Sequence, residues 1–360
     1  MAAAVVDGAG DAVELHYLKY LVLFPVLDVA ARVFPNLLIA EERPRAAATF
    51  GVFRAIGMAT GTLLPAALGG GVEHMAMGLT VFGLFEAVYM ILVTAGLYRG
   101  CARGQADVGV GEMLAFAFPL GLTDIVNTLN AAVDRYLILF LMAATAFAEY
   151  RVGAWQLPVT AIAYTVGHVY MARFVTLVRA GAGGDVIELW RTAALKTSLI
   201  VVPISMIFIV GAEEFIRLAF TADYVAAAPV FALYMLVTMA RVAPFGAVIL
   251  ATGQSNLLLR AAVFTLLSNL VISVPLALTL GFVGPALGTA LAFVPTVALY
   301  CRYISISVGV PFTRTFPLLG WLKVVALAAL AATPVYLLKS SMDLSDVLVL
   351  VFAAFTIVPL

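Results

Sequence analysis

A succession of long apolar segments, separated by short polar connections, is the feature that most constrains how this chain can fold. A helix of about 20 apolar residues crosses the roughly 30 Å hydrocarbon layer of a membrane. Of the 360 residues, 64% are hydrophobic and only 11% are charged, with a mean hydropathy of +1.10. Soluble domains carry about 25% charged residues. The sequence therefore predicts an all-α, polytopic transmembrane helix bundle.

Eleven transmembrane helices are expected from these segments. We place them at about residues 15–38, 47–68, 75–98, 112–147, 154–178, 191–212, 225–250, 258–281, 284–308, 318–338 and 343–360. The fourth segment is too long for one straight crossing, and its second half is too short to span alone. We predict one long, bent helix there, with Pro119 as the site of the kink.

Basic residues in the connections predict the orientation of the bundle, because they accumulate in short cytoplasmic loops. Arginines recur in alternate connections, whereas the opposite set holds GGGVEH, GF and the amphipathic stretch EEFIRLAFTADY at 213–224. We expect the N-terminus outside, the C-terminus in the cytoplasm, and a multi-pass protein of the bacterial cytoplasmic membrane. Cys101 and Cys301 then both lie on the cytoplasmic side, where a structural disulfide is not expected.

A near-repeat connects two parts of the chain. ARVFP at 31–35 returns as ARVAP at 240–244, and an apolar span with a similar start, AMG at 76–78 and ALG at 286–288, follows each copy at nearly the same distance. Such a register favours two related halves, as in many secondary transporters. We expect a partial N-lobe of three helices at 1–111, a six-helix C-lobe at 112–308, and two further helices at 309–360.

Polar residues form stripes on two consecutive spans. Thr123, Asn127, Asn130 and Asp134 lie on one face of the fourth helix, with Asp124 beside them, and Gln156, Thr160, Tyr164 and His168 repeat every four residues in the fifth. Hydrocarbon does not tolerate such faces, so they predict either a water-filled cavity or hydrogen bonds between helices.

Charged residues inside spans are costly and point to pairing or to function. Asp28 and Arg32 are four residues apart and can pair on one helix. Arg241 has no carboxylate nearby on its own helix, so it requires a partner from another helix, with Asp124 and Asp134 as candidates, or from a ligand. Asp124, Asp134 and Glu86 are the groups that could bind a coupling H⁺ or Na⁺.

No motif in the sequence indicates an enzyme. There is no H-E-x-x-H helix, no phosphate-binding G-x-x-x-x-G-K-[ST] loop and no Cys/His cluster with metal-ligand spacing. We therefore expect no catalytic residues, no metal site and no cofactor.

Four stretches carry a resemblance to a known family: PLGLTDIVNTLNAAVDRYLI at 119–138, ADYVAAAPVFALYML at 222–236, ATGQSN at 251–256 and NLVISVPLALTLGFVGPALGTALAF at 269–293. They resemble polysaccharide exporters, the lipid-linked oligosaccharide flippases of the multidrug/oligosaccharidyl-lipid/polysaccharide (MOP) superfamily. That superfamily also holds multidrug and toxin extrusion (MATE) antiporters and lipid II flippases. The resemblance implies a MATE-like, two-lobed fold with alternating access, of which this chain is expected to lack the first three helices.

Function follows from this resemblance as an expectation: translocation of a polyprenyl-phosphate-linked oligosaccharide or polysaccharide precursor, with polysaccharide polymerase or assembly proteins as partners and no role for nucleic acid. The expected cavity residues are Arg32, Asp124, Asn127, Asn130, Asp134, Arg135, Gln156, Tyr164 and Arg241. The three arginines among them would meet substrate phosphates. The alternatives are a cation-coupled MATE-type antiporter, a membrane-embedded sugar-transfer enzyme, and a non-transporting truncated homologue.

Overall fold

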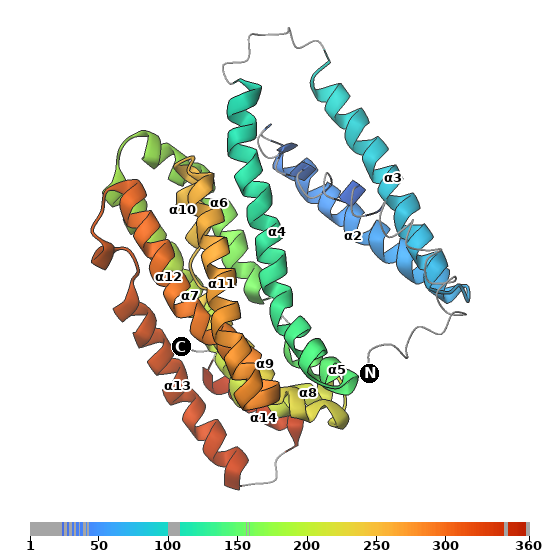
Figure 1. Ribbon diagram of the computed structural model, residues 1–360, viewed down its shortest axis with the longest axis vertical. Coiled ribbons are helices and arrows are strands. Elements are labelled where there is room, and N and C mark those ends of the chain that lie inside the picture. Colours follow the sequence, from blue (N-terminus) through green and yellow to red (C-terminus); the bar gives the residue numbers. More distant parts are fainter. Residues whose placement is uncertain are drawn as a thin grey trace. The chain divides into compact units, whose positions relative to one another are not determined.

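The computed structural model describes residues 24, 27–28, 31, 34–35, 37–38, 41, 43–99, 109–155, 157, 159–341 and 345–357. Throughout these residues the secondary structure is helical, with no strand (Figure 1). The chain divides into two compact units, residues 1–106 and 107–360. The all-α prediction is confirmed, whereas the three-part division at residues 111 and 308 stays a prediction.

The first unit contains a helical hairpin, α2 (Pro44–Ala67) and α3 (Val72–Leu97). The helices are joined by a tight turn in which Gly69 has a φ of 81°, a conformation that residues with a Cβ rarely adopt. Gly61 and Gly78 lie where the two helices cross: a Cβ on Gly78 would come within 2.2 Å of the Gly61 carbonyl oxygen. Glycine on both helices therefore allows their backbones to approach closely, as is common between transmembrane helices.

The second unit begins with α4 (Val110–Leu141) and α5 (Ala144–Gly153). The helix ends at Leu141, because Met142 adopts an extended backbone with φ −132° and ψ 177°, and a separate ten-residue helix starts at Ala144 (Figure 1). The prediction of one bent helix over 112–147 is therefore wrong in this part. Pro119 is accommodated inside α4.

The next helices are α6 (Val159–Arg179), α7 (Gly183–Val210) and α8 (Ala212–Ala219), followed by the 3-10 turn η1 (Ala222–Ala227). The helical structure of α8 agrees with the amphipathic pattern of EEFIRLAF. Trp190 on α7 is fully buried and lies in the largest apolar cluster of this unit, with Phe174 of α6 and Ile304 near the end of α12.

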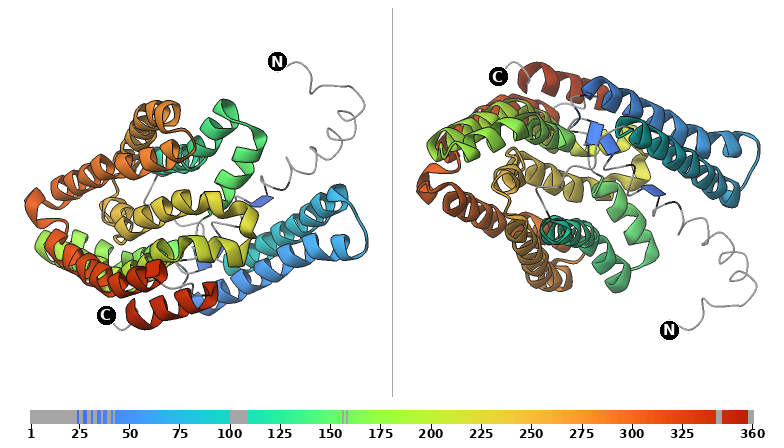
Figure 2. Two further views of the ribbon diagram at one scale, coloured as in Figure 1. Left: turned by 90° about the horizontal axis from the view of Figure 1, so that it is seen from below. Right: turned by 90° about the horizontal axis from the view of Figure 1, so that it is seen from above.

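The span expected at 225–250 is two helices, α9 (Ala228–Ala240) and α10 (Phe245–Ala251), with a break at 241–244. Pro244 explains the break, because proline has no N–H and its ring clashes with the carbonyl four residues earlier. Two long helices follow, α11 (Ser255–Leu280) and α12 (Gly284–Val308), and they lie side by side (Figure 1 and Figure 2).

The last two helices, α13 (Leu318–Ser341) and α14 (Asp346–Ile357), pack on α7, and α14 also packs on α8. Three ion pairs connect them to α8. Lys339 Nζ lies 2.9 Å from a carboxylate oxygen of the buried Glu214 and 3.9 Å from one of Glu213, and Arg217 lies 2.5 Å from Asp346. The final helices are thereby attached to the second unit.

Six stretches in the described part of the chain are long and apolar enough to cross a membrane: Arg45–Ala67, Val72–Leu97, Gly183–Val210, Ala222–Ala251, Ser255–Val308 and Phe312–Lys339. The fifth contains both α11 and α12. Helix α4 is not among them, and it carries polar and charged residues along its length, including Asn127, Asn130 and Asp134. The chain is a membrane-spanning helix bundle. Asp134 of α4 is the centre of the candidate site described next.

Candidate functional site

The polar stripe of α4 lies only partly inside the second unit. Asp134 is 3% exposed and Thr123 is buried, Asn130 is half-buried, and Asp124 and Asn127 are exposed on the surface of this unit. Arg135 points elsewhere from its neighbour, because its guanidinium donates to the Ala131 carbonyl of its own helix at 3.2 Å. The neighbouring side chains of Asp134 and Arg135 therefore have different surroundings.

Asp134 is the centre of a buried hydrogen-bond network. Its Oδ2 accepts from the Tyr234 hydroxyl of α9 at 2.5 Å and from the Thr289 hydroxyl of α12 at 2.5 Å. The Tyr150 hydroxyl of α5 lies 3.4 Å from that of Tyr234. Through these two bonds Asp134 connects α4 to α9 and α12. Hydrogen bonds to a charged acceptor are shorter and stronger than neutral ones.

The network continues into α11 through its amide and hydroxyl side chains. Asn269 donates to the Asn130 side-chain oxygen at 3.1 Å, and its own Oδ1 accepts from Ser273 at 2.5 Å and from Thr289 at 3.2 Å. Ser273 also lies 3.3 Å from the Pro285 carbonyl oxygen. Six side chains from five helices, α4, α5, α9, α11 and α12, therefore form one network with this carboxylate.

The close approach of α11 and α12 makes this convergence possible. Gly288 of α12 packs directly on Ser273: a Cβ there would lie 2.2 Å from its hydroxyl oxygen and 2.6 Å from its Cα. Real atoms cannot be so close, so any larger residue would separate the helices. Glycine at this position places the Thr289 hydroxyl, one residue further on, within reach of both Asp134 and Asn269.

One oxygen of this network has no recorded partner. Oδ1 of Asp134 is buried and accepts no hydrogen bond from the part of the chain that the structure describes. An unpaired buried carboxylate oxygen is costly. Such an oxygen can accept a proton or bind a small cation, since carboxylate oxygens are suitable ligands for hard cations. No group of three or more His, Cys, Asp or Glu side chains with metal-binding geometry occurs among the described residues.

Arg241 lies at the break between α9 and α10. Its guanidinium carbon is 5.3 Å from the centre of the Phe293 ring, a cation–π contact with α12. Its predicted ion pair with Asp124 or Asp134 is not found: the described residues include no carboxylate within 4.0 Å of Arg241, and Asp134 is bound by hydroxyl groups. With respect to the described residues, the N–H donors of this half-buried guanidinium therefore remain available to a ligand.

Two tryptophans stabilise this break. Trp321 Nε1 of α13 donates to the Met239 carbonyl at 2.9 Å, and Trp190 Nε1 of α7 lies 3.4 Å from the Pro244 carbonyl. Carbonyls at the end of a helix lack intrahelical partners, and inside a membrane they must be satisfied by other groups. The broken helix is therefore supported from two sides instead of being frayed.

Three expected cavity residues are not fully described. Arg32 and Gln156 lie outside the described residues, and Tyr164 is in α6, but its side chain is not described. The sequence analysis missed Tyr234, Asn269, Ser273 and Thr289. The four-residue spacing of Asn269 and Ser273 within an apolar helix was a usable signal for two of them.

The first unit holds a separate charged cluster, which the sequence analysis also missed in part. Arg54 of α2 pairs with Asp28, and its Nε lies 3.3 Å from Oε1 of Glu86 on α3. Asp28 and Glu86 are both buried. The predicted pairing of Asp28 with Arg32 falls outside the described residues. The lone arginine within the span at 47–68 was the available signal.

Buried charges, a broken helix and a polar network inside apolar spans are typical of membrane transporters. A family model described as lipid II flippase MurJ matches residues 11–356. The chain belongs to this family, which lies in the MOP superfamily and comprises transporters of lipid-linked precursors rather than enzymes.

Two individual proteins are similar to the chain. The probable low-salt glycan biosynthesis flippase Agl15 of Haloferax volcanii is 29% identical over 136 residues, which are 36% of this chain and 27% of that protein. A solved structure, lipid II flippase MurJ in its inward closed conformation, matches 84% of this chain and 64% of its own with a TM-score of 0.53. At 18% identity this match shows the fold alone, and the chain spans less than two thirds of either protein.

Proposed function

We propose that the chain takes part in moving a polyprenyl-phosphate-linked oligosaccharide across the membrane, with the sugar and phosphate passing through the bundle while the lipid tail stays in hydrocarbon. Family membership and the glycan flippase Agl15 support this substrate class over a drug or a soluble sugar. The observation that carries the proposal is Arg241, a cation with no carboxylate partner among the described residues, placed at a break within an apolar span.

Arg241 is suited to a phosphate for two reasons. Its guanidinium is always protonated and presents planar donors that match phosphate oxygens. A helix break inside a membrane also brings backbone groups to the substrate site, as in many transporters. A cation-coupled antiporter for cationic drugs would instead favour acidic groups at this position. The sugar-transfer enzyme and the non-transporting homologue have no such role for Arg241.

Asp134 is proposed to bind the coupling ion, H⁺ or Na⁺. Among the three carboxylates considered, Glu86 forms an ion pair with Arg54 and Asp124 is exposed. Asp134 is buried, forms no ion pair with a described residue and has one oxygen without a recorded partner. The same carboxylate already contacts Thr289 of α12, and Thr289 in turn contacts Asn269 of α11. Binding would then tighten α4, α11 and α12 around the ion, and release would loosen them.

Translocation after substitution of Arg241 tests the phosphate role. The full chain would be reconstituted in vesicles with a fluorescent lipid-linked oligosaccharide, whose outer-leaflet pool is quenched by an impermeant reductant. Arg241→Ala should slow translocation roughly tenfold or more, because a charge-assisted contact is worth about 1.5 to 3 kcal/mol. Arg241→Lys should retain part of the rate. Arg260→Ala, at an exposed position of α11, is the matched control. An unchanged rate for Arg241→Ala would refute the role.

Coupling is tested by imposing gradients on the same vesicles. With Asp134→Asn, acceleration by a proton or sodium gradient should disappear, while the slow rate without a gradient persists. Asp223→Asn, exposed in η1, should keep the acceleration. Gradient dependence that survives in Asp134→Asn would exclude this carboxylate but leave the substrate proposal intact.

Location and organisation complete the proposal. We place the protein in the bacterial cytoplasmic membrane with its N-terminus outside and C-terminus inside, and we assign 1–111, 112–308 and 309–360 to a partial N-lobe, a C-lobe and two accessory helices. Labelling single cysteines at residues 69 and 181 with an impermeant reagent on whole cells would test the orientation, since only the first should react.

A further inference from the structure

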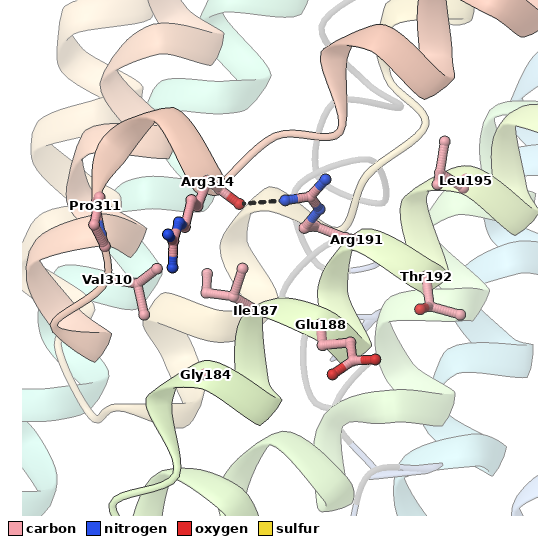
Figure 3. A pocket seen from close by; sticks show the side chains of 9 residues that line it. All are labelled: Gly184, Ile187, Glu188, Arg191, Thr192, Leu195, Val310, Pro311 and Arg314. Carbon is pink, nitrogen blue, oxygen red and sulfur yellow. Dashed lines mark hydrogen bonds between the residues drawn. The ribbon is translucent and has the colours of Figure 1, made fainter.

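A pocket of about 440 Å³ lies at one end of the second unit, apart from the Asp134 network and from Arg241. It is formed by the first turns of α7 and by the connection from α12 to α13. Its lining residues are Gly184, Ile187, Glu188, Arg191, Thr192, Leu195, Val310, Pro311 and Arg314 (Figure 3). Two of its three ionisable side chains are arginines.

The pocket is held in shape by specific contacts. Gly183 packs against the end of α12, where a Cβ would lie 2.1 Å from the Val308 carbonyl oxygen. Ser305 donates to the Val310 carbonyl at 2.6 Å, and Thr315 donates to the Phe312 carbonyl at 2.7 Å. These bonds fix the connection that carries Arg314, so the site does not depend on a freely moving loop.

Neither arginine of the pocket is paired with a carboxylate of the described residues, and Arg191 is held in place. Arg191 donates to the Arg314 backbone carbonyl at 3.1 Å, which uses one of its five N–H groups and holds the guanidinium in place (Figure 3). Among the described residues no carboxylate forms an ion pair with either arginine. The carboxylate of Glu188 points away from both guanidinium groups (Figure 3). The pocket therefore presents two cations to an incoming anion.

The position of the pocket relative to the membrane spans indicates the source of that anion. Two candidate membrane spans, Gly183–Val210 and Phe312–Lys339, both begin at this pocket. The strongly exposed apolar side chains Leu318 and Leu319 follow Arg314 within five residues. Hydrocarbon thus begins directly beside the guanidinium groups, and basic groups at this level attract anionic headgroups.

We propose that Arg191 and Arg314 bind the phosphate of an anionic phospholipid, whose acyl chains lie along the start of α13. The site is independent of the translocated substrate. A bound headgroup would bridge α7 to the connection before α13 and so stabilise the attachment of the last two helices.

Native mass spectrometry of the full chain, delipidated in detergent and titrated with phosphatidylglycerol, tests this site. Each of Arg191→Gln and Arg314→Gln should weaken binding roughly fivefold, since a basic residue near the surface is worth about 1 kcal/mol. Glu188→Gln should strengthen binding, a gain that misfolding cannot produce. Arg302→Gln is the control: this arginine is exposed on α12 near the same end but does not line the pocket.

Four outcomes of this experiment would overturn the proposal. Arg302→Gln could weaken binding as much as the pocket variants, which would indicate a diffuse charge effect. Phosphatidylcholine could bind with the same dependence on the two arginines. Inorganic phosphate at millimolar concentration could displace the lipid, which would indicate a soluble ligand. Polyprenyl phosphate at equal concentration could displace it preferentially, which would make the pocket a substrate subsite.

Discussion

Thr289→Val removes one hydroxyl from the buried network while preserving the shape of the side chain. In the native chain this hydroxyl donates at 2.5 Å to Oδ2 of Asp134 and lies 3.2 Å from Oδ1 of Asn269. A hydroxyl has one proton, so its main contribution goes to the shorter contact with the carboxylate. After the substitution the Tyr234 hydroxyl still donates to Oδ2 of Asp134.

The expected loss in the free energy of unfolding is roughly 1.5 kcal/mol. Hydrogen bonds to charged groups contribute about 1.5 to 3 kcal/mol in soluble proteins, but side-chain bonds in membrane helices average about 0.6 and reach about 1.7. We take the upper part of the membrane range, because the other oxygen of the same carboxylate has no recorded partner and cannot compensate. Combined with Tyr234→Phe, the loss should exceed the sum of the single losses.

Reversible unfolding in mixed detergent micelles, followed by helical circular dichroism, measures this loss. Thr296→Val is the matched control on the same helix: its hydroxyl is also buried, but it donates to the Ala292 carbonyl at 2.8 Å and contacts the Thr265 hydroxyl. Its loss should stay near 0.6 kcal/mol, to the order of the membrane average. Equal losses for both variants, or additivity with Tyr234→Phe, would refute the idea that Asp134 organises the network.

Two further predictions concern packing and the helix break. Gly288→Ala should lower the free energy of unfolding by about 1 to 3 kcal/mol, because its Cβ overlaps Ser273, whereas Gly121→Ala, with no atom within 4 Å, should be neutral or stabilising; equal effects in the same unfolding assay would contradict this. Trp321→Phe should cost about 1 kcal/mol by leaving the Met239 carbonyl without its indole donor, and faster proton exchange at the start of α10 should accompany it. Unchanged exchange would show that the break does not need this support.

Much of the helical architecture could be predicted from the sequence, because apolar length alone decides which segments can cross a membrane. The bounds of α12 agree with the predicted span at 284–308, and those of α2, α3, α11 and α13 are close to prediction. The two failures have local causes. Met142 is extended without any proline or glycine to signal it, and Pro244 lies inside the predicted span at 225–250 but separates two helices.

Of the candidate site, only the polar residues of α4 and Arg241 could be predicted from the sequence. The period of the α4 stripe identified Asp134 and Asn130, and the absence of a local carboxylate identified Arg241. Their partners lie about 100 to 155 residues away. Tyr234 and Thr289 carry no periodic signal, and only Asn269 and Ser273, four residues apart on α11, gave a partial one. Likewise, the stripe could not separate its buried members from its exposed ones, since Asn127 shares the predicted face of Asp134 but is exposed.

By itself the sequence determined that this chain is a helical membrane protein with costly polar groups inside its spans, because hydrocarbon imposes the same requirement on every segment wherever it packs. The tertiary structure alone decided which of those groups meet. The approach of α11 to α12 at Gly288 gathers hydroxyl groups around Asp134, and the break at Pro244 leaves Arg241 beside a ring instead of an acid. Such encounters depend on distances between distant helices, which no local pattern encodes.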